Sequence, residues 1–334
     1  MATVTKGESV VSVNDLSVSY TTVYGTVRAL NKVSISIASG ESVSIVGESG
    51  CGKSTLGHSI VRLLPPNASY DSGKIMLDGM DVVSLSSTGA AKMRGREAFM
   101  IFQDPLNSLN PVKRVDVQML EAIRMKDRHQ GKSFDEKDAY DEATKWLEDV
   151  RMPDPEQIMR RYPHQLSGGQ IQRVVIAMGL LMKPRLLIAD EPTSALDVTI
   201  QAQVLKLLRE LQREYQMSII FITHDINVAY AVSDRMVVMY AGEVAESGDS
   251  DKLTRSAFHP YSQALIKSIP RITKKEGRLT AIEGAPPNML APPAGCRFHP
   301  RCPQVMDVCR VKSPVTLKKD GEEVRCFLYG GADN

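Results

Sequence analysis

The sequence predicts an α/β fold with a parallel sheet core, an N-terminal antiparallel β subdomain, an inserted helical subdomain and a small C-terminal cysteine-rich extension. Three observations support this prediction. A glycine-rich stretch, GESGCGKST, follows the apolar run SVSIV and precedes the helical pattern LGHSIVRLL. Apolar strands and a helical pattern alternate again between residues 185 and 225, as in α/β proteins. Four of the five cysteines lie in the last 40 residues.

The expected elements follow an order that divides the chain into regions. Strands are predicted by partly alternating or continuously apolar runs, which lie at residues 10–20, 27–38, 72–82, 98–105, 185–192, 218–225 and 235–248. Helical patterning covers residues from about 105 to 180. A later helix is predicted by apolar residues at helical spacing, namely Val204, Leu207, Leu208 and Leu211. We therefore expect one large domain over residues 8–249 and an extension over residues 250–334.

Composition excludes several classes of protein. The chain has 334 residues, of which 43% are hydrophobic and 24% charged, close to globular averages. A formal charge of +2 is too small to indicate nucleic-acid binding, so no nucleic-acid partner is expected. We find no signal-peptide pattern and no apolar run of about 18 residues that could span a membrane. These features predict a cytosolic protein that reaches a membrane only through a partner.

The glycine-rich stretch predicts a phosphate-binding loop. It matches the template GxxxxGK[ST] through Gly47, Gly52, Lys53 and Ser54. Glycines let successive backbone N–H groups turn inward and form an anion nest, which the following helix dipole strengthens. Lys53 is expected to reach the β and γ phosphates, and the Ser54 hydroxyl to coordinate Mg²⁺. A loop that binds nothing is disfavoured by the strand before it and the helix after it.

Two acids end the buried strand LLIADE. Alternate side chains of a strand face opposite ways, so Asp190 and Glu191 are expected to have different roles. Asp190 is the candidate for a second Mg²⁺ ligand, through water, and Glu191 for the base that polarises the attacking water. A merely solvated strand end or a helix N-cap is the alternative interpretation, which the upstream phosphate loop makes less favourable.

A second anion site is predicted at LSGGQ, residues 166–170. Ser167, Gly168 and Gly169 precede a helical pattern and offer a hydroxyl, backbone N–H groups and a helix N-terminus. Seventeen residues separate Gln170 from Ile188, a spacing that we judge too short for the helix to fold back onto its own phosphate loop. We infer that this second site serves a nucleotide held by another subunit.

Together these motifs resemble the nucleotide-binding subunit of ABC transporters, which have the P-loop NTPase fold. The chain carries Walker A GESGCGKST, the Q-loop residue Gln103, the signature LSGGQ, Walker B LLIADE, a D-loop with Ser194 and Asp197, and the switch histidine His224. All six are in family order. The resemblance implies a dimer in which each of two ATP molecules contacts one phosphate loop and the other subunit's signature.

The resemblance also implies site residues. Catalytic roles fall to Glu191, to His224, which would hold the γ phosphate, and to Gln103, which would contact Mg²⁺ and water. Nucleotide contacts fall to Gly47, Ser49, Gly50, Cys51, Gly52, Lys53, Ser54, Thr55, Ser167, Gly168, Gly169, Gln170, Asp190 and Asp197. Tyr20 matches the aromatic residue that stacks on adenine, with Tyr24 as a rival and simple packing as the structural alternative.

The cysteines after residue 290 have the spacing Cx5C, Cx6C and Cx16C and are Cys296, Cys302, Cys309 and Cys326. Disulfides are disfavoured in a reducing cytosol. Zinc usually requires tight CxxC pairs, which are absent here, although His299 could replace one cysteine. An iron–sulfur cluster suits four thiolates without such pairs. Chemistry alone leaves the cluster, zinc and unliganded thiols open.

A second resemblance concerns the same region. The stretches HPYSQAL, LTAIEGAPPNML and PAGCRFHPRCP are similar to the C-terminal extension of dipeptide and oligopeptide importer ATPases of the D-subunit type. In that family four cysteines hold a [4Fe-4S] cluster, which the resemblance extends to the four cysteines here, with zinc as the alternative.

The two resemblances imply a function. We expect Mg-ATP hydrolysis that powers an importer for di- or oligopeptides at the cytoplasmic face of the membrane. The expected partners are a second, related ATPase subunit, two membrane permeases and, indirectly, an extracytoplasmic binding protein. Importers of oligosaccharides or other solutes are the alternative within the class. A soluble ABC ATPase would need a coiled-coil insertion or a second cassette, and a non-catalytic binder should lack Glu191, His224 or the signature.

Overall fold

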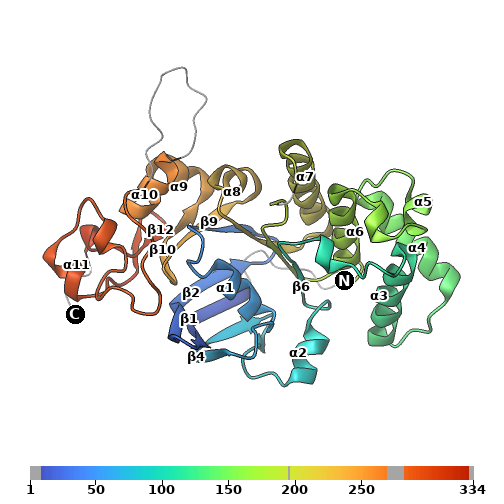
Figure 1. The fold of residues 1–334 in the computed structure, drawn as a ribbon, viewed down its shortest axis with the longest axis horizontal. Helices are drawn as coiled ribbons and strands as arrows, with labels where there is room; N and C mark the ends of the chain where they lie inside the picture. The colour runs from blue at the N-terminus through green and yellow to red at the C-terminus, as the bar shows by residue number, and fades with distance from the viewer. Residues whose placement is uncertain (1–8, 195, 269–281, 331–334) are drawn as a thin grey trace, which may run out of the picture. The chain divides into compact units, whose positions relative to one another are not determined.

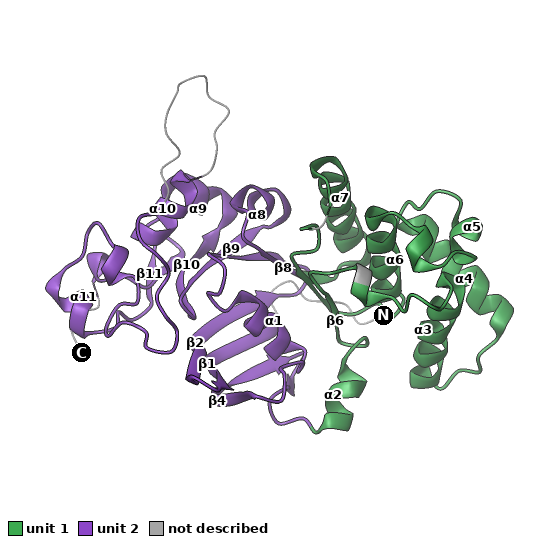
Figure 2. Cartoon of the chain, in the orientation of Figure 1, with its two compact units in different colours: residues 1–8, 86–219 green, residues 9–85, 220–334 purple. Residues whose placement is uncertain are grey.

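The computed structural model describes residues 9–194, 196–268 and 282–330. These residues form two compact units (Figure 2). Unit 1 contains residues 86–219, and unit 2 contains residues 9–85 together with the described residues after 220. The chain therefore leaves unit 2 after residue 85 and returns to it at residue 220.

Unit 2 begins with the predicted antiparallel sheet (Figure 1). Its strands, in the spatial order β2-β1-β4-β5, are β2 (Gly25–Ala38), β1 (Ser9–Thr22), β4 (Ala68–Leu77) and β5 (Met80–Asp81). Strands β1 and β2 form a hairpin in which Thr22 pairs with Gly25. Buried side chains of β1, among them Val11, Val13 and Val18, alternate along part of the strand and form the apolar face of this sheet.

The phosphate loop follows a strand of the second, larger sheet, of which several strands belong to unit 2. Strand β3 (Ser42–Val46) is wholly buried and pairs in parallel with β9 (Arg235–Tyr240). The order continues through β10 (Glu243–Asp249), β12 (Glu322–Val324) and β11 (Leu317–Lys319), all antiparallel. The predicted hairpin at residues 235–248 is thus β9 and β10. The helices of unit 2 are α1 (Lys53–Ile60), α8 (Ile226–Val232), α9 (Ser250–Ser256), α10 (Pro260–Lys267) and α11 (Asp307–Val311).

Unit 1 combines parallel strands with most of the long helices (Figure 1). Strands β6 (Ala98–Ile101) and β7 (Leu186–Asp190) are parallel neighbours, and β8 (Ser218–Thr223) begins at the end of this unit. The helices are α2 (Ser87–Met93), α3 (Val115–Gln130), α4 (Glu136–Asp149), α5 (Pro155–Met159), α6 (Gly168–Leu180) and α7 (Val198–Tyr215). All five residues of β7 are buried, as its continuous apolar pattern predicts.

Two carboxylates are buried where β12 pairs with β10. Glu246 faces no solvent and accepts hydrogen bonds from the backbone N–H groups of Phe258 and His259, at 2.6 and 3.0 Å. Glu322 is only 3% exposed, and among the described residues its Oε2 has no hydrogen-bond partner. Burial, and then the charge of Glu246, raise the pKa of Glu322 to about 7. The ionised form of Glu322 therefore destabilises the fold.

We expect Glu322→Gln to stabilise the protein at pH 8 by about 1–3 kcal/mol. The raised pKa contributes stability that is fully present below about pH 4.5, the ordinary pKa of a glutamate, and that is lost as the pH rises through about 7. The variant and the parent should therefore diverge over this window and stay apart above it. Urea unfolding at several pH values measures the difference. A difference that is constant with pH would contradict the assignment.

Candidate functional site

The phosphate loop connects β3 to α1 in unit 2 and needs glycine at two positions. Gly47 has φ 153°, and a Cβ there would lie 2.1 Å from the carbonyl oxygen of Met239. Gly52 has φ 102°, and its Cβ would lie 2.6 Å from the carbonyl oxygen of Ala29. Both approaches are closer than real Cβ atoms allow. The loop is therefore seated tightly on neighbouring backbone, as a loop that presents N–H groups to an anion requires.

Lys53 lies within this loop rather than in solvent. Its side chain is buried, and Nζ donates to the carbonyl oxygens of Gly47 and Glu48 at 2.8 and 3.0 Å. Cys51 Sγ accepts from the same ammonium at 3.8 Å. Burial raises the pKa of the Cys51 thiol, so this residue packs as a neutral side chain. Ser49, Gly50 and Ser54 are exposed.

The two candidate adenine-stacking tyrosines differ in their surroundings. Tyr20, near the end of β1, has its hydroxyl 3.1 Å from Thr55 Oγ1, which places it beside the helix that follows the phosphate loop. Tyr24 lies in the β1–β2 turn and is 85% exposed. Its ring has accessible faces, which stacking on a base requires.

In unit 1, the Q-loop residue contacts the proposed base directly. Gln103 Nε2 donates to Glu191 Oε2 at 3.1 Å. Ser194 Oγ lies 3.2 Å from the carbonyl oxygen of Glu191 and 3.5 Å from that of Gln103. Asp190 is buried at the end of β7, and Glu191 follows it with φ 44°. Three predicted residues are therefore brought together, and one of them has a left-handed backbone of the kind that often marks functional sites.

The signature forms the start of helix α6. Ser167 is the N-cap, and its hydroxyl accepts from Gln170 N at 3.3 Å. The Gln170 side chain returns the contact by accepting from Ser167 N at 2.9 Å, which completes a capping box. Gly168 and Gly169 occupy the first turn. The Ser167 hydroxyl, which the sequence predicts to bind an anion, therefore caps the helix. The backbone N–H groups at the N-terminus of α6 still form the kind of helix terminus that attracts anions.

Asp197 and His224 lie at the ends of secondary-structure elements. Asp197 is the N-cap of α7 and accepts from the backbone N–H groups of Thr199 and Ile200 at 3.1 and 3.0 Å. His224 directly follows β8 and is exposed. Asp225, the next residue, caps α8. Of the predicted residues, His224, the two tyrosines and the phosphate loop belong to unit 2, whereas Gln103, the signature, the Walker B acids and Asp197 belong to unit 1.

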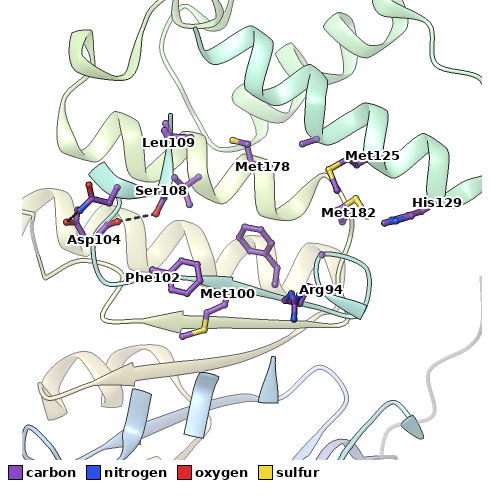
Figure 3. Close-up of a pocket in the computed structure, with 15 residues that line it drawn as sticks. Arg94, Met100, Phe102, Asp104, Ser108, Leu109, Met125, His129, Met178 and Met182 are labelled. Atoms are coloured by element: carbon purple, nitrogen blue, oxygen red, sulfur yellow. Dashed lines mark hydrogen bonds between the residues drawn. The ribbon is translucent and has the colours of Figure 1, made fainter. Parts of the chain in front are cut away.

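A cavity of about 590 Å³ lies in unit 1 beside the Q-loop (Figure 3). Its apolar lining comes mainly from three segments, namely the end of β6, helix α3 and the end of α6. The apolar side chains include Met100, Phe102, Met125, Met178 and Met182. Met125 is 60% exposed, and four of these five are methionines, which adapt readily to a partner surface. Asp104 and Ser108, which are hydrogen-bonded to each other at 3.1 Å, lie near one end.

The four cysteines of the extension lie within electrostatic range of one another. Burial, and then the charges of Cys309, Cys326 and Cys302, raise the pKa of Cys296 to about 11. Burial likewise raises the pKa of Cys326 to about 11. All are free thiols. Within the described part of the chain, no group of three or more His, Cys, Asp or Glu side chains could hold a metal ion, so the iron–sulfur prediction is not confirmed.

Two features of the structure were not predicted from the sequence. The first is the cavity, whose lining comes from segments that are far apart in the chain. The second is an ion pair between Arg301 of the extension and Glu48 of the phosphate loop, at 2.6 Å, between residues 253 positions apart. No local pattern points to either feature. Separately, none of the helices within the described residues is both long and apolar enough to cross a membrane.

Comparison with known families gives two matches. Residues 30–194 match the family described as "ABC transporter", and residues 245–309 match "Oligopeptide/dipeptide transporter, C-terminal region". The dipeptide transport ATP-binding protein DppD of Bacillus subtilis is 46% identical over 323 residues, covering 96% of this chain and 95% of that protein. The oligopeptide transport ATP-binding protein OppD of Salmonella typhimurium is 42% identical, covering 94% of this chain and 92% of that protein.

Solved structures agree with the fold prediction. The ATP-binding cassette MJ0796, in a dimeric post-hydrolysis state bound to ADP and Pi, has a TM-score of 0.64 at 29% identity, covering 72% of this chain and 98% of its own. CbiO1 of Clostridium perfringens, part of an ABC transporter complex, has a TM-score of 0.63 at 30% identity, covering 75% of this chain and 92% of its own. The P-loop ATPase fold is confirmed, and this chain belongs to the dipeptide and oligopeptide transport family of ABC ATP-binding proteins.

Proposed function

We propose that this chain hydrolyses ATP to power an ABC importer for di- or oligopeptides. The observation that carries the proposal is the conformation of the loop at residues 47–55. Neighbouring backbone leaves no room for a Cβ at Gly47 or Gly52, and the Lys53 side chain lies within the loop. Family membership supplies the coupling to transport, because the curated relatives are dipeptide and oligopeptide transport ATP-binding proteins. Residues 8–249 would form the ATPase domain and residues 250–334 the extension.

The phosphate loop would bind the phosphates of ATP. Its backbone N–H groups and the Lys53 ammonium would neutralise the β and γ phosphates, and Tyr24, with its exposed ring, or Tyr20 would stack on adenine. Mg²⁺ prefers oxygen ligands, and the predicted donor set of the Ser54 hydroxyl, the Asp190 carboxylate and the Gln103 amide oxygen provides only these. The bound ion would neutralise charge that develops on the transferred phosphoryl group.

Hydrolysis would proceed by in-line attack of water on the γ phosphate, without a covalent intermediate. The Glu191 carboxylate would accept a proton from the water. The hydrogen bond from the Gln103 amide would keep this carboxylate oriented. His224 would hold the γ phosphate and position the water. Since Gln103 belongs to the loop beside the cavity, a partner seated in the cavity would influence the orientation of Glu191.

A second ATPase subunit would complete each nucleotide site. The N-terminus of α6, with Ser167, Gly168 and Gly169, would contact the γ phosphate of a nucleotide held by the partner. The relation to a cassette that is dimeric in its ADP-bound structure supports this arrangement. The partner is proposed to be a related but different subunit, so that the pair is a heterodimer at the cytoplasmic face of the membrane.

The cavity beside the Q-loop would receive a permease. Its apolar, methionine-rich lining suits the apolar face of a short amphipathic helix from the cytoplasmic side of a membrane subunit. Two permeases would bind the two ATPase subunits, and an extracytoplasmic binding protein would deliver the peptide to them.

The four cysteines of the extension would hold a [4Fe-4S] cluster. The four thiols lie close enough to interact electrostatically, and they supply the number and type of donor that such a cluster needs. The proposal also draws on the sequence resemblance, since the side chains are not arranged as a metal site in the structure. Zinc bound by the same thiols is the competing outcome.

Glu191→Gln should lower ATP hydrolysis by at least about 100-fold, because it removes the proton acceptor. ATP binding should persist, and the ATP-bound dimer should accumulate on size-exclusion chromatography because closure is no longer followed by hydrolysis. The control is Glu210→Gln, which removes an exposed acid paired with Arg151 in the same unit and should hydrolyse ATP normally. Retained hydrolysis in Glu191→Gln would remove this residue from the mechanism.

Met125→Glu should disrupt binding to the permeases, because it places a charge at the exposed edge of the apolar cavity. Co-purification with membrane-embedded permeases should fall at least about tenfold, a loss of about 1.4 kcal/mol. Met125→Leu keeps the apolar surface and should bind as the parent does. Equal binding by both variants would place the permease elsewhere.

Protein purified without oxygen should be brown, contain about four iron atoms per chain and bleach with dithionite. Cys309→Ser should lose colour and iron. Cys51→Ser, which changes the fifth cysteine in the phosphate loop, should keep both. Colourless protein that contains stoichiometric zinc would refute the cluster.

A further inference from the structure

Glu48 is the point at which the phosphate loop meets the C-terminal part of unit 2. Its backbone N–H donates to Tyr261 Oη at 2.9 Å, and its carboxylate accepts from Arg301 Nη1 and Nη2 at 2.6 and 3.0 Å. Its carbonyl oxygen accepts from Lys53 Nζ at 3.0 Å. A single residue of the loop therefore joins two residues of the extension to Lys53, the lysine proposed to bind the phosphates.

The Arg301 side chain is fixed by contacts other than the one with Glu48. Its side chain is only 5% exposed, and Nε donates to the carbonyl oxygen of Glu283 at 2.9 Å. Nη1 also lies 3.3 Å from the Tyr240 hydroxyl, and the guanidinium lies over the Tyr240 ring, 5.8 Å from its centroid. A planar fork fixed in this way matches both oxygens of a carboxylate, which an ammonium cannot do. The pair is therefore a directional contact as well as an attraction between charges.

Tyr261 is equally constrained. It is fully buried in α10, and its ring packs against Tyr240, with centroids 4.6 Å apart, and against Phe298, at 5.4 Å. Phe298 and Arg301 belong to the cysteine-containing segment, and Arg301 directly precedes Cys302. The aromatic cluster and the ion pair thus fix the extension and the loop to each other within unit 2.

We propose that Arg301 and Tyr261 are positioning residues for nucleotide binding, which act by holding Glu48 and, through its carbonyl oxygen, the Lys53 ammonium. The extension thereby sets the affinity of the phosphate loop for ATP. The inference rests on the proposed function of this loop. A contact that merely held the fold together would change the unfolding temperature and leave the ATP affinity of the folded protein unaltered.

The test measures equilibrium binding of a fluorescent ATP analogue, with Mg²⁺, to the full-length chain. Arg301→Gln should weaken binding about tenfold, and Arg301→Lys should restore only part of it because a point charge cannot replace the fork. Adding Glu48→Gln to Arg301→Gln should cause little further loss, since both changes remove the same contact. In steady-state hydrolysis, KM for ATP should rise more than kcat falls.

Arg325→Gln is the matched control. Arg325 also lies in the extension directly before a cysteine, but its partners are Glu243, at 3.6 Å, and the carbonyl oxygen of Pro314, at 2.9 Å. It should therefore leave ATP affinity unchanged even if it lowers the unfolding temperature. Should Arg301→Gln fail to fold, Tyr261→Phe removes only the hydroxyl acceptor and should weaken ATP binding several-fold.

The possible results separate this inference from the function on which it rests. Lys53→Ala should abolish binding of the analogue, and unchanged binding in that variant would overturn the phosphate loop itself. If Lys53→Ala loses binding while folded Arg301→Gln and Tyr261→Phe bind as the parent does, the inference alone is wrong. Equal weakening by Arg301→Gln and Arg325→Gln would also overturn it, because the effect would then be a general loss of structure.

Discussion

The tight seat of the phosphate loop on backbone is the constraint on which the rest of the structure depends. Side chains at Gly47 or Gly52 would collide with carbonyl oxygens of other strands, so the loop has little freedom to relax. Between these glycines, the backbone N–H of Glu48 donates to Tyr261 and its carboxylate accepts from Arg301. The anion-binding conformation is thus built before any ligand arrives, which lowers the entropy that binding would otherwise cost.

The chemistry of unit 1 is organised around a second constrained point. Glu191 has a left-handed backbone conformation, which costs on the order of 1–3 kcal/mol and is maintained by surrounding contacts. Its carboxylate meets Gln103, and its carbonyl oxygen lies near Ser194. The residue proposed to accept a proton is therefore connected to the loop beside the apolar cavity. This connection gives a physical route by which a bound partner would affect hydrolysis.

Much of the fold and the motif set could be predicted because local sequence carries them. The buried strand β7, the antiparallel hairpin and the apolar face of α7 follow from periodicity, and the phosphate loop follows from its glycine spacing. The capping role of Ser167 was missed because cap and anion site share one residue pattern. The Arg301–Glu48 pair could not be predicted, since its members are 253 positions apart in the chain and only packing of the extension brings them together.

Amide hydrogen exchange measured on the full-length protein tests most directly whether the extension holds the phosphate loop. In the parent, the amides of Glu48 and Cys51 should exchange slowly, because they donate to the Tyr261 hydroxyl and to the Glu48 carbonyl oxygen. In Arg301→Gln these amides should exchange markedly faster, whereas those of β7 in unit 1 should keep their parental rates. Identical exchange of the loop in the two proteins would contradict the account.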